Sequence, residues 1–230
     1  MKDLLLLHGA LGAASQFDEL KARLSGKFNV HTFDFYGHGK NDSDGPLSID
    51  WFSLQLNRVV AANGLSNPCV FGYSMGGYVA LNCERTNQVS FEKIVTLGTK
   101  FGWDPESSKK EAGYLNPDVI MEKIPHYGQY LESLHPGIGW RNLLIKTADM
   151  MLDLGENPIL SNSDLSGIEC DVKLMLGSED RMVSVDETKE IAGRIDGCKF
   201  QSLDGVPHPI DKIETSFLEE LISKEFSDVL

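Results

Sequence analysis

Apolar strand-like segments alternate with amphipathic helix-like segments in the first part of the chain, and this alternation restricts the fold more than any other feature. The strand-like segments lie at residues 4–7, 28–35, 69–73 and 94–97. Helix-like segments separate them, and the one from Ser48 to Asn63 follows a favourable N-cap and has apolar residues at helical spacing. Strands that are apolar throughout are buried on both faces, which requires helices on both sides of a parallel sheet. The sequence therefore predicts an α/β fold.

A long segment, residues 99–167, interrupts this alternation and has helix signals without a convincing strand. Asp104 followed by a proline is typical of a helix start, and Gly155 is placed as the C-cap of a later helix. Strand-like and helix-like segments then resume at 172–176, 184–195, 199–203 and 210–226. We expect a core formed by 1–98 and 168–230, with 99–167 inserted as a helical cap.

The charge balance bears on possible partners. The formal charge of the 230-residue chain is −13, with 34 acidic against 21 basic residues. Such a surface has no electrostatic match to nucleic acid or to an anionic membrane, so we expect a small-molecule substrate and neither of these partners. The four cysteines have no zinc-binding spacing, which predicts reduced thiols and no metal site. We find no signal sequence and no apolar run near the ~20 residues of a membrane span, and expect a cytoplasmic monomer or homodimer.

The motif GYSMG at residues 72–76 lies between an apolar strand and an amphipathic helix. The chain must turn sharply there, and the small residues on either side of Ser74 permit the turn without steric conflict. The serine hydroxyl is then presented at the C-terminal edge of the sheet, over the positive end of the next helix. The alternative is a glycine-rich turn with an incidental serine, which the strand–turn–helix setting disfavours. Ser74 is therefore the candidate nucleophile.

A serine hydroxyl is a poor nucleophile and needs a neighbouring base, which in turn is oriented by an acid. Of the six histidines, only His208 follows the last predicted strand, in a loop bounded by glycine and proline. Asp180 follows the preceding strand, and the alternatives for the acid are Glu179 nearby and Asp186 farther along. The order serine, acid, histidine is the one that a strand–elbow–helix serine enzyme requires. These three side chains are the candidate catalytic residues.

The negative oxygen that forms when a carbonyl is attacked needs backbone N–H donors aimed at it. One is expected from Met75, which follows the candidate nucleophile, and the second from the loop after the first strand, where Ala10 is the best-placed donor. His8 in this loop is either a hydrogen-bonded brace or an acid or ligand, and we favour the brace. Asp34 and the turn at 37–39 are expected to organise the neighbouring loop.

Five segments together resemble the α/β-hydrolase superfamily, in particular its small, capped, esterase-like members: LLLLHGALGAASQF, DFYGHGKND, GYSMGG, VKLMLGSEDRMVS and VPHPID. The resemblance covers the core from end to end and leaves only 99–167 unmatched, where the family carries its cap. It implies the same catalytic and oxyanion-hole roles for Ser74, Asp180, His208, Ala10 and Met75. Because Met1 lies almost on the family's third strand, we expect about six mostly parallel strands rather than eight, with helices on both faces.

The resemblance leaves several reactions open. The first hypothesis is hydrolysis of a carboxylic ester or thioester through an acyl-Ser74 intermediate, without a cofactor. The superfamily also includes carbon–carbon hydrolases, lyases and perhydrolases with the same catalytic residues, and a ligand-binding receptor with vestigial turnover is a further alternative. Epoxide and haloalkane hydrolases are disfavoured, because they use an aspartate where this chain has serine.

Aromatic side chains are the candidate substrate contacts, since ligand pockets are mostly lined by apolar and aromatic residues. The candidates are Tyr73, Trp103, Tyr127 and Trp140. Core packing is the alternative for each of them, because aromatic residues at helical spacing usually belong to a core. The cap also carries His126 and His135, whose positions relative to a substrate the sequence does not specify.

Overall fold

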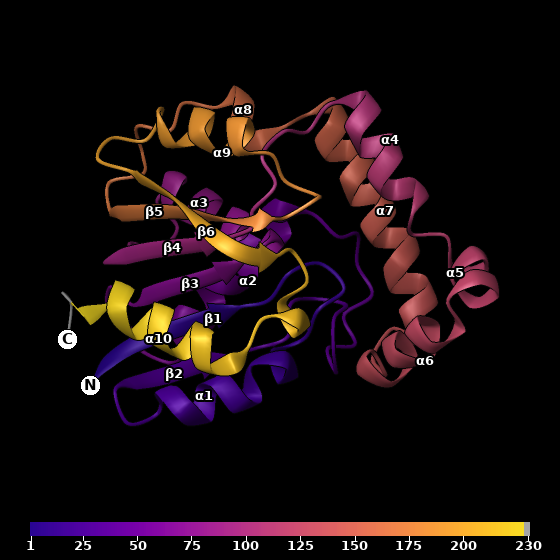
Figure 1. Cartoon of the computed structure of the whole chain (residues 1–230), viewed down its shortest axis with the longest axis horizontal. Helices are drawn as coiled ribbons and strands as arrows, with labels where there is room; N and C mark the ends of the chain where they lie inside the picture. Colours follow the sequence, from indigo (N-terminus) through magenta and orange to yellow (C-terminus); the bar gives the residue numbers. More distant parts are fainter. Residues whose placement is uncertain (228–230) are drawn as a thin grey trace.

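A computed structural model describes residues 1–227, apart from the side chain of Asn162. The described residues form a sheet of six parallel strands in the order β2-β1-β3-β4-β5-β6 (Figure 1). The strands are β1 (Lys2–Leu7), β2 (Phe28–Thr32), β3 (Cys69–Tyr73), β4 (Lys93–Leu97), β5 (Asp171–Glu179) and β6 (Lys199–Pro207). The predicted α/β fold with about six strands is confirmed.

Alternate side chains of the strands enter two apolar cores, one on each face of the sheet. In β1, Leu5 and Leu7 pack into one core and Leu4 and Leu6 into the other, because successive strand residues point to opposite faces. The first core is covered by α2 (Ile49–Ala62), α3 (Met75–Arg85) and α9 (Val185–Ala192), and the second by α1 (Asp18–Leu24), which follows η1 (Ala14–Phe17), and α10 (Thr215–Glu225). Helices therefore cover both faces, as predicted.

Side-chain caps determine where several helices begin. Ser48 Oγ accepts a hydrogen bond from Trp51 N–H at 3.1 Å and caps α2. Asp104 accepts from two amides in the first turn of α4 (Pro105–Gly113). Ser184 and Glu187 form a reciprocal capping box at the start of α9. The predicted helix starts at Ser48 and Asp104 are therefore confirmed.

The last two strands run farther than the sequence indicates. β5 continues to Glu179 and β6 to Pro207, and these two residues pair beyond a register shift that begins at Gly177. The segment predicted as a loop before His208 is therefore largely strand, because pairing with β5 stabilises an extended backbone despite its glycine and proline. The final helix is also shorter than predicted, since a 3₁₀ turn, η2 (Ile210–Lys212), precedes α10.

Helices without strands occupy the connection between β4 and β5, whose backbone is described throughout. They are α4 (Pro105–Gly113), α5 (Pro117–Lys123), α6 (Pro125–Leu134), α7 (Trp140–Glu156) and α8 (Ile159–Asn162). α4 packs along α7, and α5 packs against α6. Figure 1 shows α4 to α7 standing together beside the C-terminal ends of the strands. No helix within residues 1–227 is long and apolar enough to span a bilayer.

Gly155 does not end α7 as predicted. The helix continues through it to Asn157, which is the C-cap. A β-carbon at position 155 would collide with the Ser108 side chain of α4 and would lie 2.8 Å from the Asp104 carbonyl oxygen. The glycine therefore lets α4 and α7 approach closely. In the sequence, a glycine needed for such a contact looks the same as a glycine that ends a helix.

Candidate active site

Ser74 joins β3 to α3 in a backbone conformation that non-glycine residues rarely adopt, with φ 50° and ψ −118°. Its amide donates a hydrogen bond to the Leu97 carbonyl at 2.9 Å. The Thr99 hydroxyl donates to the Ser74 carbonyl, also at 2.9 Å. Both partners belong to β4 or to the residues just after it, so the neighbouring strand holds the strained residue in place.

Two glycines flanking Ser74 provide the space for this turn. A β-carbon at Gly72 would lie 2.5 Å from the Cα atom of Gly77, and a β-carbon at Gly76 would collide with the carbonyl of Leu7. Real β-carbons essentially never approach other atoms this closely. The strand, turn and helix can therefore meet at Ser74 only because these positions lack side chains.

His208 and Asp180 form a buried hydrogen-bonded pair. The distance between His208 Nδ1 and Asp180 Oδ2 is 2.7 Å, and the side chains are 10% and 1% exposed. The other carboxylate oxygen of Asp180 accepts from the amides of Met182 and Val183 at 2.8 and 3.0 Å. Since a carboxylate can only accept, Nδ1 carries a proton and Nε2 has its lone pair free. An imidazole in this tautomer can act as a base.

Tyr73 supports His208 from the strand that leads to the elbow. Its hydroxyl donates to the His208 carbonyl at 2.9 Å, and the two rings lie 5.6 Å apart. Glu179 and Asp186, the alternatives for the acid, are exposed and make no hydrogen bond to the His208 ring. Asp180 is thus the carboxylate that the fold brings to His208.

Ala10 and Met75 line the same cavity as Ser74 and His208. Neither amide donates a hydrogen bond to a residue among 1–227. Met75 begins α3, so its N–H points out of the positive end of that helix. The oxyanion-hole role of these two amides stays a prediction.

Two buried histidines hold the loop that contains Ala10. His8 Nδ1 donates to the Gly9 carbonyl at 2.8 Å, and its Nε2 accepts from the Phe35 amide at 3.1 Å. His135 Nε2 donates to the carbonyl of Leu11 at 3.0 Å. Leu11 needs such support because its φ of 58° is strained for a residue with a side chain. His8 is therefore positioned as a brace, the interpretation that we favour from the sequence.

His135 does not line the cavity. It lies between α6 and α7, is 1% exposed, and its Nδ1 accepts from the Gly39 amide at 2.8 Å. It therefore connects the helices of 99–167 to the loops of the core. His38 completes the cluster, with its ring 5.2 Å from that of His8 and 6.0 Å from that of His135. Burial lowers the pKa of all three histidines, that of His8 to about 4, which keeps them neutral at pH 7.

Acidification from about pH 7 to about pH 4 is expected to lower the free energy of unfolding. His8 has a pKa of 6.5 when unfolded and about 4 when folded, so the unfolded chain binds more protons between these values. Stability is therefore fully present above pH 6.5 and is lost as the pH falls toward 4. His8 alone accounts for roughly 3 kcal/mol. Urea unfolding across this pH range measures the effect.

The matched variants for this measurement are His135→Gln and His126→Gln. Removing His135, which burial keeps neutral, should make the loss of stability with acid shallower. Removing His126, which is exposed, should leave the slope unchanged. An unfolding free energy that stays constant across the range would show that the buried cluster does not control acid stability.

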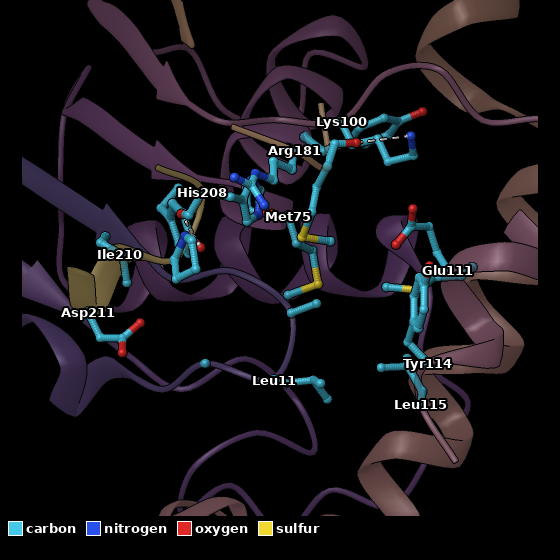
Figure 2. Close-up of a pocket in the computed structure, with 18 of the residues that line it drawn as sticks. Leu11, Met75, Lys100, Glu111, Tyr114, Leu115, Arg181, His208, Ile210 and Asp211 are labelled. Atoms are coloured by element: carbon cyan, nitrogen blue, oxygen red, sulfur yellow. Dashed lines mark hydrogen bonds between the residues drawn. The ribbon is translucent and has the colours of Figure 1, made fainter. Parts of the chain in front are cut away.

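A cavity of about 800 Å³ contains Ser74 and His208 in its wall. It lies between the C-terminal ends of the strands and the helices α4, α6 and α7. Figure 2 shows His208 and Met75 on the core side, and Glu111, Tyr114 and Leu115 facing them from α4 and its C-terminal end. Among residues 1–227, no group of three or more His, Cys, Asp or Glu side chains is placed to hold a metal ion.

Three of the four predicted aromatic contacts, Tyr73, Trp103 and Tyr127, line this cavity, as does His126. Trp140 does not. It is 6% exposed and packs with other apolar residues of the helical connection, including Leu144. Its helical spacing in the sequence therefore reflects core packing, the alternative stated for each aromatic residue.

The cavity also contains residues that sequence reasoning did not single out. From α7 come Met150, Met151 and Leu154, and from the loops after β4 and β5 come Lys100 and Arg181. Both cations lie in the loops that follow strand ends, which is the available sequence signal. The α7 residues share their helical spacing with apolar residues that the helix buries elsewhere, so spacing alone does not separate cavity contacts from core.

Known proteins with similar sequences include hydrolases. Pimeloyl-[acyl-carrier protein] methyl ester esterase of Pectobacterium atrosepticum is 27% identical over 119 residues, which cover 52% of this chain and 44% of that protein. The human serine hydrolase-like protein is 36% identical over 98 residues, which cover 41% of this chain and 48% of that protein. The chain thus spans less than half the length of these two curated relatives.

Solved structures and a family model match nearly the whole chain. A thermophilic esterase structure from Thermogutta terrifontis superposes with a TM-score of 0.78, at 19% identity, over 100% of this chain and 90% of that one. An esterase from Exiguobacterium antarcticum gives 0.76, at 16% identity, over 99% and 92%. Such identities show a common fold. A sequence model of the alpha/beta hydrolase family matches residues 4–211. With a parallel sheet that leads to a serine elbow, the chain belongs to the alpha/beta hydrolase family.

Proposed function

We propose that this protein is a serine hydrolase that cleaves a carboxylic ester or thioester of a small, largely apolar substrate. The main support is the buried hydrogen bond of 2.7 Å between His208 and Asp180, in a cavity whose wall also contains the elbow serine, Ser74. Esterase names among the partial relatives point the same way.

In the first half of the reaction, Ser74 Oγ attacks the carbonyl carbon of the ester and His208 Nε2 takes the hydroxyl proton. The carbonyl oxygen becomes an oxyanion, which accepts hydrogen bonds from the amides of Ala10 and Met75. Asp180 stays ionised and stabilises the imidazolium through the Nδ1–H bond. The intermediate then collapses, the C–O or C–S bond breaks, and the leaving alcohol or thiol takes its proton from His208.

In the second half, water attacks the acyl-Ser74 ester and gives a proton to His208. A second oxyanion forms in the same hole and collapses to the free acid, while Ser74 Oγ recovers its proton from the imidazolium. We further propose that residues 99–167 act as a cap. Their side chains, Trp103 and Tyr127 among them, would enclose the apolar part of the substrate beside Tyr73.

Turnover of p-nitrophenyl esters of increasing acyl length tests this proposal. We expect hydrolysis at one or more lengths, with a burst of p-nitrophenol when deacylation is slow. A fluorophosphonate probe should label Ser74 in parallel. Labelling without turnover of any ester would contradict ester hydrolysis and favour a lyase, a carbon–carbon hydrolase or a receptor. Failure of both assays would contradict an activated serine.

A further inference from the structure

Two cationic side chains, Lys100 and Arg181, line the same cavity. Lys100 follows β4 and Arg181 follows β5, and these strands pair directly in the sheet. The ends of adjacent parallel strands meet at one edge, so the two residues come from neighbouring loops. Lys100 Nζ donates to the Met182 carbonyl at 3.5 Å. In Figure 2, Arg181 lies between His208 and Lys100.

Neither of these two cations forms an ion pair in the part of the chain that the structure describes, and Lys100 interacts at longer range with the Asp104 carboxylate, whose pKa it lowers. The Arg181 guanidinium makes no hydrogen bond to residues 1–227. The nearby carboxylates have other partners, since Asp180 binds His208 and Asp104 caps α4.

The charge of the cavity wall is opposite to that of the whole protein. Its basic side chains outnumber the acidic ones, the bases being Lys100, Lys110, Arg181 and Lys212 and the acids Glu111 and Asp211. Lys212 and Asp211 approach within 3.9 Å and largely offset each other. Glu111 also faces the cavity and forms no ion pair among residues 1–227. A cavity of this sign in an acidic protein concentrates anionic ligands at the site.

We propose that the cavity binds esters that also carry a carboxylate, and that Lys100 and Arg181 bind this carboxylate while Ser74 attacks the ester. The inference rests on the proposed function and specifies its substrate class. The planar guanidinium of Arg181 presents paired donors that match a carboxylate, and Lys100 adds a second positive charge. Trp103 and Met182, which line the same wall, provide apolar surface for the chain between the two groups.

Matched methyl esters test the proposal. Monomethyl succinate, adipate and suberate differ from methyl butanoate, hexanoate and octanoate by a carboxylate in place of the terminal methyl group. We expect kcat/KM to favour the carboxylate-bearing ester by about tenfold or more at the chain length that fits. Added salt should reduce this preference, because it screens the exposed Arg181 charge. Methyl 6-aminohexanoate, of opposite charge, should be the poorest substrate of the hexanoate length.

Variants connect the preference to the two cations. Lys100→Gln and Arg181→Gln should each lower the preference for the carboxylate-bearing ester by about tenfold. The value of kcat/KM for the neutral ester should change little. Glu111→Gln should raise this preference, because it removes a negative charge that repels the substrate carboxylate. Lys109→Gln is the matched control, since Lys109 is exposed on α4 and does not line the cavity. Equal use of both esters at every chain length, or a preference that survives both cation variants, overturns the proposal.

Binding measurements separate this proposal from the proposed function. If neither class of ester is hydrolysed, ester hydrolysis is wrong, and calorimetry with monomethyl adipate and methyl hexanoate then decides the substrate class. Tighter binding of the adipate hemiester, lost in Arg181→Gln, would support the carboxylate site. Equal binding of the two esters would overturn it.

Discussion

Replacing Ser74 with alanine is expected to lower kcat for ester hydrolysis by about 10⁶-fold. The change removes the hydroxyl oxygen that forms the acyl intermediate in the proposed mechanism. Without it, His208 and Asp180 have no nucleophile to activate. The fold should persist, because alanine keeps both backbone hydrogen bonds of this residue. Its amide still donates to the Leu97 carbonyl, and its carbonyl still accepts from the Thr99 hydroxyl. Initial rates with the best p-nitrophenyl ester measure the loss, and urea unfolding checks the stability.

Ser166→Ala is the matched control, since Ser166 is exposed and, among residues 1–227, hydrogen-bonds only to Asp164. This variant should retain full activity and fluorophosphonate labelling. Substantial hydrolysis by purified Ser74→Ala protein would show that another group attacks the ester, and the proposed mechanism would be wrong.

Replacing Asp180 with asparagine is expected to lower kcat by about 10⁴-fold while KM changes little. An amide can present its N–H₂ to the ring, which forces the proton onto Nε2 and removes the lone pair that should accept from Ser74. Asparagine also cannot stabilise the imidazolium. Its oxygen can still accept from Met182 and Val183, which should keep the loop folded. Steady-state kinetics, with the rate of fluorophosphonate labelling as a second readout, measure the effect.

The matched controls for the acid are Glu179→Gln and Asp186→Asn. Both side chains are exposed and neither hydrogen-bonds to the His208 ring, so each substitution should change kcat by less than about twofold. A larger loss in Glu179→Gln than in Asp180→Asn would assign the orienting role to Glu179 instead.

Local patterns in the sequence specified the strands and the elbow because the relevant interactions lie within a few residues. A fully apolar run such as that of β1 must be buried on both faces, whatever packs against it. The glycines around Ser74 report a close approach between neighbouring parts of the chain. The predicted order of serine, aspartate and histidine then led to the buried pair of Asp180 and His208.

Other expectations failed where the same residue type fits two structural roles, and only contacts with distant parts of the chain decide between them. Gly155 resembles a helix end and proves to be a contact between two helices. Trp140 resembles a substrate contact and proves to be core. The extended end of β6 depends on pairing with β5, which outweighs the local preference of glycine and proline. In each case the deciding partner lies far away in the chain.

The sequence by itself determined the α/β class, the elbow at Ser74 and the pairing of Asp180 with His208, since periodicity, glycine placement and the position of a residue after a strand are local features. The tertiary structure alone decided the cavity wall, including Lys100 and Arg181, and the histidines that support the Ala10 loop. The reason is physical. Burial, charge pairing and the direction of a side chain depend on which distant segments pack together, and one chain position does not contain that information.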